Sequence, residues 1–243
     1  MGRIAALLNQ KGGVGKTAVT LGLASAADSA GHRVLVVDLD PQGSSTWVLG
    51  HDPADEQSSG HPVTVVTSHW GSNVDLVPSS PTLHHDRTIV PAQLRRDLHG
   101  VAGDYDAVLI DCPPSLGNLT TGGLAAADFA LIVVDPAALG LRGIGAVADA
   151  IDEVWDSHNP DLELAGVIVN RVPAISSEAD RRMDELVRIV GRKAIWQPPV
   201  PQRVIVNQAI GERRPIHSYG SRAADVVDAF DKLWTKLRKA ARS

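Results

Sequence analysis

Glycines, two lysines and a threonine lie together near the start of the chain, in the stretch Gln10–Thr17. The apolar run Ile4–Leu8 precedes this stretch, and the helix-like run Val19–Ala24 follows it. A strand, a glycine-rich turn and a helix in this order form a phosphate cradle, because the glycines let backbone N–H groups approach the oxygens and the helix N-terminus adds its positive dipole end. In this arrangement Lys16 reaches the terminal phosphates and the Thr17 hydroxyl ligates Mg²⁺.

The usual spacing of such loops has glycine at the position of Gln10. The stretch resembles the deviant Walker motif of the ParA/MinD ATPases, in which an additional lysine precedes the paired glycines. Lys11 matches that lysine, and Asn9-Gln10 before it is the ParA-like version. The resemblance implies a P-loop ATPase that forms an ATP-sandwich dimer, in which Lys11 of one subunit reaches the nucleotide of the other.

The same resemblance assigns a continuous set of loop residues to the nucleotide: Gly12, Gly13, Val14, Gly15, Lys16, Thr17 and Ala18. Relatives commonly have a Thr-Thr pair where this chain has Thr17 and Ala18. The alanine takes away a hydroxyl that could contact the α-phosphate.

Two acidic residues, Asp38 and Asp40, follow the apolar run Arg33–Val37. A carboxylate just past the carboxyl end of a parallel strand lies where ligands bind in such sheets. The segment resembles the ParA switch segment, which implies that Asp40 orients the attacking water beside the metal ion and that Asp38 supports the strand end. The alternative is structural, since Asp-Pro-Gln-Gly is also a good turn sequence.

A second acidic strand end, Asp111, closes the apolar run Asp106–Ile110 in a Walker B pattern. A buried strand holds such a carboxylate rigidly near Mg²⁺. Thr17 and Asp111, with Asp40 beside them, are therefore the predicted metal-site residues. Cys112 follows directly, and it is predicted to be a small buried residue because no base is in view to activate its thiol.

Two later positions match residues that the wider family uses at the nucleotide base. Asn170 ends the apolar run Leu164–Val169, where an asparagine often contacts adenine; the alternative is a strand-terminating Asn. Gln197–Arg203 resembles the ParA loop that helps to hold the base, and Pro201 lies within it.

Strands and helices alternate along the chain, which predicts a doubly wound, mostly parallel α/β sheet with helices on both faces and a single domain over residues 1–243. The predicted strands are Ile4–Leu8, Arg33–Asp38, Val63–Val66, Val74–Val77, Asp106–Asp111, Phe129–Val134, Leu164–Val169 and Ala194–Trp196. The predicted helices after the first are Pro91–Ala102, Leu119–Ala127, Leu141–Ser157, Ser176–Val190 and Ser221–Ala240.

The composition excludes several classes of protein. A single cysteine excludes a disulfide framework and cannot supply the ligands of an iron–sulfur cluster or structural zinc within one chain. Residues 1–25 lack the features of a signal peptide, and no apolar run approaches a membrane span. We therefore expect a cytoplasmic protein.

The polar stretch 50–62 and His84–Asp86 are predicted surface loops, the latter in preference to a metal site.

The net charge of −5 is unevenly distributed. Residues 1–170 contain 8 Lys and Arg against 20 Asp and Glu, a charge of −12, and residues 171–243 contain 15 against 8, a charge of +7. A basic C-terminal third on an acidic protein favours a local polyanion-binding face over ordinary solvated faces. The candidate DNA contacts are Arg203, Arg213 and Arg214.

The last helix offers a membrane alternative, because its apolar residues lie beside a cationic face. Its apolar stripe continues through Val226, Val227 and Phe230, so we expect it to pack on the domain and to leave Lys232, Lys236 and Lys239 in solvent.

The resemblance covers nearly the whole chain and implies a ParA-type partition or positioning ATPase. Such a protein binds ATP and Mg²⁺, dimerises, binds DNA without sequence preference on the nucleoid and hydrolyses ATP slowly until a ParB-like partner speeds it. The main alternative is a MinD-like membrane-associated ATPase. A nitrogenase-type iron protein would need cysteine ligands that bridge a dimer, and a bacterial tyrosine kinase would have a C-terminal tyrosine cluster. The cargo, whether chromosome, plasmid or protein assembly, is left open.

Overall fold

The computed structural model describes residues 2–52, 63–79, 90–136 and 141–240. Within them a seven-stranded sheet has the order β3-β4-β2-β5-β1-β6-β7, and only the pair β3 and β4 is antiparallel. The strands are β1 (Arg3–Leu8), β2 (Val34–Asp38), β3 (Val66–Thr67), β4 (Val74–Val77), β5 (Ala107–Asp111), β6 (Phe129–Val134) and β7 (Glu163–Val169).

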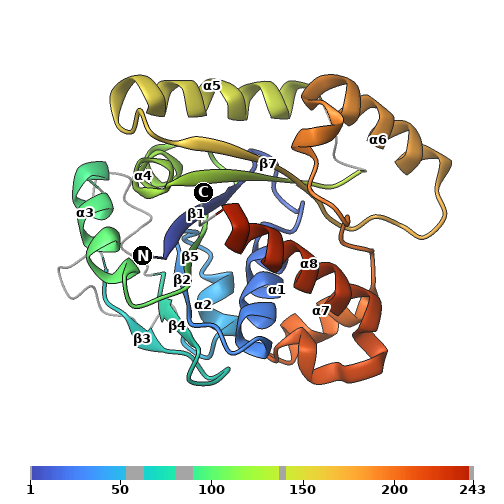
Figure 1. Ribbon diagram of the computed structural model, residues 1–243, viewed down its shortest axis with the longest axis horizontal. Helices are drawn as coiled ribbons and strands as arrows, with labels where there is room; N and C mark the ends of the chain where they lie inside the picture. Colours follow the sequence, from blue (N-terminus) through green and yellow to red (C-terminus); the bar gives the residue numbers. More distant parts are fainter. Residues whose placement is uncertain (1, 53–62, 80–89, 137–140, 241–243) are drawn as a thin grey trace.

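Helices cover both faces of this sheet (Figure 1). One face carries α1 (Lys16–Ser29), α2 (Ser44–Val48), α7 (Val204–Gly211) and α8 (Ala224–Ala240). The other carries α3 (Pro91–Ala102), α4 (Asn118–Ala126), α5 (Leu141–Ser157) and α6 (Ser177–Val190).

Side chains alternate along each strand and so supply both cores. In β1, Ala5 and Leu7 pack in the core with α1 and α8, whereas Ile4, Ala6 and Leu8 pack in the other core. This architecture confirms the predicted doubly wound, mostly parallel α/β fold.

The strand order brings three strand ends together. β2, β5 and β1 are neighbours, and all three are parallel, so their carboxyl ends lie at one edge of the sheet. Asp38 is in register with Asp111, and Asp111 with Leu7. The loop after β1 therefore starts beside both acidic strand ends, at the kind of position where ligands bind in open α/β sheets.

Some local predictions are wrong. A strand at Ala194–Trp196 is absent: Arg192–Ala194 forms a 3₁₀ helix, η2, and Ile195 makes one isolated bridge. Gly191, at φ 79°, turns the chain just before this stretch, and Pro198 follows it without an N–H to donate, so little length is left for pairing.

The C-terminal helix also begins later than predicted. A 3₁₀ segment, η3 (Ile216–Ala223), precedes α8 because Gly220 takes a non-helical conformation. α7 was not predicted as a helix, and the strand expected at Val63–Val66 is Val66–Thr67. His84–Asp86 and most of the predicted loop 50–62 lie outside the described residues.

Candidate functional site

The loop between β1 and α1 has the backbone of a phosphate cradle. Gly13 and Gly15 have φ values of 81° and 88°, in the left-handed region that glycine enters without strain, and Gly15 is the N-cap of α1. Val14 is buried and fixes the middle of the loop, and Gly12 lies exposed before it. The helix then opens at Lys16, which is only 7% exposed.

Asn9 fastens the start of this loop to the sheet. Its side-chain nitrogen donates to the Val133 carbonyl of β6 at 2.7 Å, and its side-chain oxygen accepts from the Lys11 backbone N–H at 2.9 Å. The Lys11 side chain itself is exposed, and it makes no ion pair with any residue in the described ranges. A fixed backbone thus presents a lysine that has no ion pair within the described part of the chain.

Asp111 provides a buried carboxylate at the end of β5. Its Oδ2 accepts a hydrogen bond from the Ser45 hydroxyl at 2.8 Å. Its Oδ1 is buried and has no hydrogen-bond partner among the described residues. The Thr17 hydroxyl and the Lys16 ammonium are near enough to act on this carboxylate. An unpartnered buried oxygen beside a hydroxyl suits the oxygen-seeking ion Mg²⁺, so the donor set fits the predicted metal site.

The electrostatics of the strand ends follow from their burial. Burial raises the pKa of Asp111 above its usual range, while the hydroxyls of Thr17 and Ser45 and the charge of Lys16 act in the opposite direction. Burial also raises the pKa of the Asp38 carboxyl, and the neighbouring charge of Asp111 adds to this effect. A cation bound near the Asp38 and Asp111 carboxyls would stabilise their charged forms.

Asp38 and Asp40 have different surroundings. Asp38 is buried and supports the loop after β2: its Oδ2 accepts from the Thr46 N–H and hydroxyl, both at 2.7 Å, and its Oδ1 accepts from the Asp40 N–H at 3.1 Å. The predicted supporting role of Asp38 agrees with these contacts. Asp40 is partly exposed, and its charge acts on Asp111. Its role with water stays a prediction.

Sequence reasoning missed the hydroxyls of Ser45 and Thr46. Both lie on α2, which Gly43 caps just after the acidic segment. Thr46 also accepts from the Ser79 N–H at 2.8 Å and so joins the ends of β2 and β4. The signal in the sequence was the run of hydroxyl residues Ser44–Thr46, which follows the acidic segment after a single turn at Pro41–Gly43.

Of the two residues predicted to contact the base, Asn170 lies against the glycine loop. Asn170 is 3% exposed, and its side-chain nitrogen donates to the Val14 carbonyl at 2.9 Å. Its amide oxygen remains the acceptor for the predicted adenine contact. Pro201 forms a bridge with Val172, so its loop runs alongside the continuation of β7. Ala18 faces the apolar side of α7.

The structure does not gather the three candidate DNA contacts into one cluster. Arg203 lies at the start of α7 and pairs with Asp225 at 2.6 Å. Arg213 and Arg214 follow the other end of this eight-residue helix, about 12 Å away by its rise. The guanidinium of Arg213 lies over Trp47, and that of Arg214 lies over Tyr219.

The exposure of the three α8 lysines agrees with the prediction at two positions and differs at one. Lys232 is exposed and pairs with Asp228 at 2.7 Å, and Lys239 is exposed. Lys236, which we expected in solvent, is half-buried with its ammonium 4.9 Å from the ring centre of Trp196, and burial lowers its pKa. The rotation of α8 places this lysine over the body of the protein.

Comparisons with known proteins agree with this geometry. Residues 2–164 match a family model described as an AAA domain. The chain is 32% identical over 242 residues to the sporulation initiation inhibitor protein Soj of Bacillus subtilis, covering 93% of this chain and 95% of that protein. It is 33% identical over 239 residues to the chromosome partitioning protein ParA of Myxococcus xanthus, covering 90% and 82%.

Solved structures are similar over the whole fold. Cobyrinic acid a,c-diamide synthase from Mycobacterium smegmatis, with bound ADP and magnesium, has a TM-score of 0.84 at 29% identity and covers all of this chain and 96% of that one. The cell division ATPase MinD of Pyrococcus furiosus has a TM-score of 0.76 at 23% identity, covering 99% and 100%. At that identity the second likeness concerns the fold alone.

Proposed function

Because the chain belongs to the ParA/MinD superfamily of P-loop ATPases, we propose that its ATP-bound form is a dimer that binds DNA and segregates DNA or positions a cargo. The chain is a ParA-type ATPase that uses ATP, ADP and Mg²⁺. The observation that carries the proposal is that Lys11 is exposed and has no ion pair among the residues the structure describes, on a loop whose other lysine, Lys16, is buried.

The reaction divides among a few side chains. Backbone N–H groups of the glycine loop and Lys16 hold the phosphates, and Thr17 and Asp111 hold Mg²⁺, which when bound offsets charge on the phosphate oxygens. Asp40 orients water at the rim of the site. Lys11 enters the neighbouring subunit's site, where its charge stabilises the transition state. Asn170 and Pro201 contact the base.

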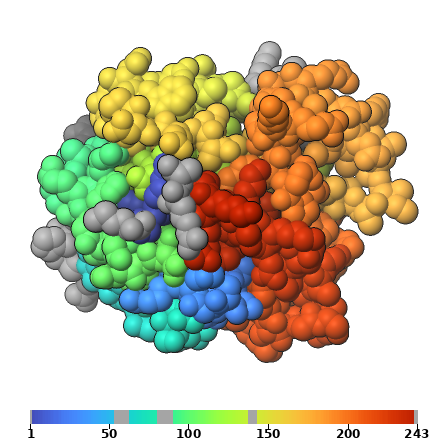
Figure 2. Space-filling view, viewed as in Figure 1, coloured from blue at the N-terminus to red at the C-terminus, as the bar shows by residue number. Residues whose placement is uncertain are grey.

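DNA binding is supported by the position of the positive charge. Residues 171–243 hold the excess of Lys and Arg. Of these, residues 171–240 form one continuous side of the molecule, coloured orange to red in Figure 2. Arg214 is exposed near Tyr219, and Arg213 lies over Trp47. Such cations bind phosphates without reading sequence.

We expect Arg214→Ala and Arg213→Ala each to weaken ATP-dependent DNA binding. If each arginine contacts one phosphate, its loss lowers the slope of log affinity against log salt by about 0.9. The measurement is a DNA titration by fluorescence anisotropy at several salt concentrations. Arg96→Ala, which removes an exposed arginine from α3, is the control and should match the wild type. An unchanged salt slope in both variants would place the DNA surface elsewhere.

A membrane surface is the competing partner. No helix within the described ranges is long and apolar enough to cross a bilayer. In α8, the apolar residues Val226, Phe230 and Leu233 are buried in the core, so this stripe is not free to enter a membrane surface. Cosedimentation with anionic liposomes beside a DNA shift assay, both with ATP, tests the choice. Liposome binding without DNA binding would favour the MinD-like alternative.

A partner of the ParB type, on the nucleoid in the cytoplasm, completes the proposed cycle by speeding hydrolysis and so releasing the dimer from DNA. The cargo is set by this partner, because the residues of the ATP site are independent of what is carried.

A further inference from the structure

Two side chains at the end of β7 hold the backbone of the glycine loop. Asn170 donates to the Val14 carbonyl at 2.9 Å and approaches the Gly15 carbonyl at 3.5 Å. Arg171, the next residue, donates from Nη1 to the Gly13 carbonyl. The carbonyl groups of Gly13 and Val14 therefore accept hydrogen bonds from this strand end, and the Gly15 carbonyl, which also accepts from the Val19 N–H at 3.0 Å, lies beside it.

Because the peptide unit is rigid, contacts to the loop carbonyls also fix the direction of the loop N–H groups. A trans peptide unit is planar, and its C=O and N–H point in opposite directions. Carbonyls of residues 13, 14 and 15 that face β7 therefore turn the N–H groups of Val14, Gly15 and Lys16 away from it. No described residue accepts a hydrogen bond from these three N–H groups. Unpaired, converging N–H groups are the donors that a phosphate cradle needs.

Gly15 allows this close approach. A Cβ atom at this position would lie 2.2 Å from the Asn170 side-chain nitrogen, so any larger residue would push the asparagine away from the loop. The glycine is required both for its left-handed backbone and for its contact with β7.

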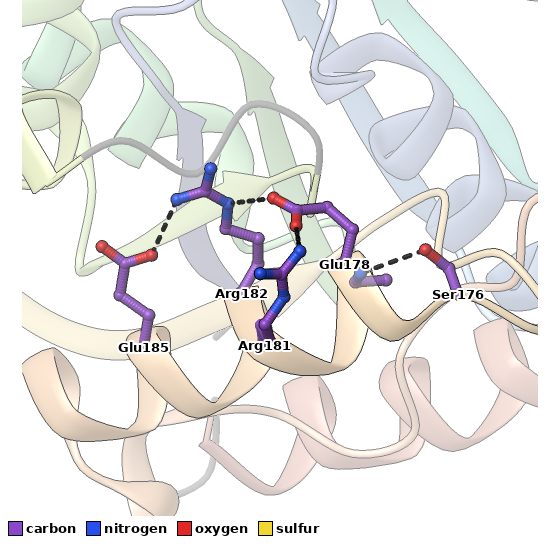
Figure 3. A network of polar contacts seen from close by, with 6 residues as sticks. Ser176, Glu178, Arg181, Arg182 and Glu185 are labelled. Carbon is purple, nitrogen blue, oxygen red and sulfur yellow. Dashed lines mark hydrogen bonds and ion pairs between the residues drawn. The ribbon is translucent and has the colours of Figure 1, made fainter.

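Arg171 has an unusual backbone that suits this role. Its φ is 57°, a left-handed conformation that non-glycine residues rarely adopt and that persists where surrounding contacts fix it. Neighbouring arginines are engaged differently: Arg181 and Arg182 pair with Glu178 on their own helix, as Figure 3 shows. Within this group, Arg171 is the one that reaches the glycine loop.

We propose that Asn170 and Arg171 are positioning residues of the phosphate site. They clamp the carbonyl side of the glycine loop and so aim the N–H groups of Val14, Gly15 and Lys16 at the phosphates. The proposal rests on the proposed phosphate site and adds to it two residues that act through the loop backbone.

The test uses the full chain and a fluorescent ADP analogue with Mg²⁺. Hydrogen bonds that involve a charged group change a binding constant roughly tenfold or more, so we expect Arg171→Ala to bind ADP about tenfold more weakly. Since the N–H groups contact phosphate before and during reaction, KM for ATP should rise by a similar factor while kcat changes little. Arg171→Lys should recover part of the loss, because it keeps a cationic donor.

Arg171→Gly separates this role from stability. Glycine accepts a φ of 57° without strain, and a solvent-connected cavity of about 140 Å³ adjoins the arginine, so no sealed void is left. We expect this variant to unfold at a temperature no lower than that of the wild type, yet to bind ADP as weakly as Arg171→Ala. Arg181→Ala, which removes an arginine that pairs with Glu178 on its own helix, should match the wild type in both measurements.

Two results would overturn the proposal in distinguishable ways. Wild-type ADP affinity in Arg171→Ala and Arg171→Gly, with binding lost in Lys16→Ala, would leave the phosphate site intact and exclude the clamp. Wild-type affinity in Lys16→Ala would show that the phosphate site itself lies elsewhere.

Discussion

Lys16→Ala is expected to lose measurable binding of ATP and ADP. Lys16 is 7% exposed and lies close enough to Asp111 to act on the pKa of that carboxyl, so its ammonium would interact with the phosphates in a partly desolvated site. Two unit charges about 4 Å apart at a protein surface interact by about 4 kcal/mol, which corresponds to roughly a thousandfold in affinity. Titration with a fluorescent ATP analogue and Mg²⁺ measures this loss.

The matched control removes a lysine outside the site. Lys193 lies exposed in η2, and Lys193→Ala should bind the analogue as the wild type does. The two variants should unfold at similar temperatures without nucleotide. If Lys16→Ala kept wild-type affinity, the assignment of residues 10–17 to the phosphates would be wrong.

Asp40→Ala is expected to bind ATP but to hydrolyse it about a hundredfold more slowly or worse, the range for loss of a group that acts on the attacking water. Asp40 is partly exposed at the rim of the site. The Asp38 carboxylate and the Ser79 hydroxyl hold its backbone, and its own Oδ1 accepts from the Gln42 N–H at 3.0 Å in an exposed turn. Removing the Asp40 carboxylate loses this exposed contact but keeps the two to the backbone, so the loop should stay in place. Phosphate release at saturating ATP gives kcat, and analogue titration gives the affinity.

Asp38→Ala is compared with Asp40→Ala because the two variants should differ in their unfolding temperature. Asp38 accepts hydrogen bonds from the Thr46 backbone, the Thr46 hydroxyl and the Asp40 backbone, and its loss leaves these donors without a partner. We expect this variant to unfold at a lower temperature, whereas Asp40→Ala should not. Normal turnover by Asp40→Ala would exclude the proposed role of Asp40.

The positions of the strand ends in the site could be predicted from the sequence, because the last residues of parallel strands lie at one edge of the sheet. Asp38 and Asp111 could be placed near the glycine loop before the register between them was known. The glycine loop could be recognised because its closely spaced glycines followed by Lys16 and Thr17 are needed for phosphate binding and for few other structures. For this loop, the local sequence pattern and the overall fold lead to the same site.

Other parts depend on packing that local patterns do not encode. The hydroxyl of Ser45 reaches Asp111 only because α2 starts directly after the acidic segment. The sequence does not distinguish Arg171 from the other basic residues of the C-terminal third. Its contact with Gly13 follows from a left-handed backbone at a non-glycine position. Lys236 was expected in solvent, but the rotation of α8 sets it over Trp196.

ATP is proposed to join two chains through Lys11, and light scattering separates the mass of one chain from that of two. With ADP and Mg²⁺ the wild type should have the mass of one chain, and with a non-hydrolysable ATP analogue and Mg²⁺ the mass of two. Lys11→Ala should bind the analogue but keep the mass of one chain, because its loop backbone is held by Asn9 and only the exposed ammonium is lost. A wild-type mass that is the same with both nucleotides, or a Lys11→Ala variant that doubles its mass as the wild type does, would contradict the claim.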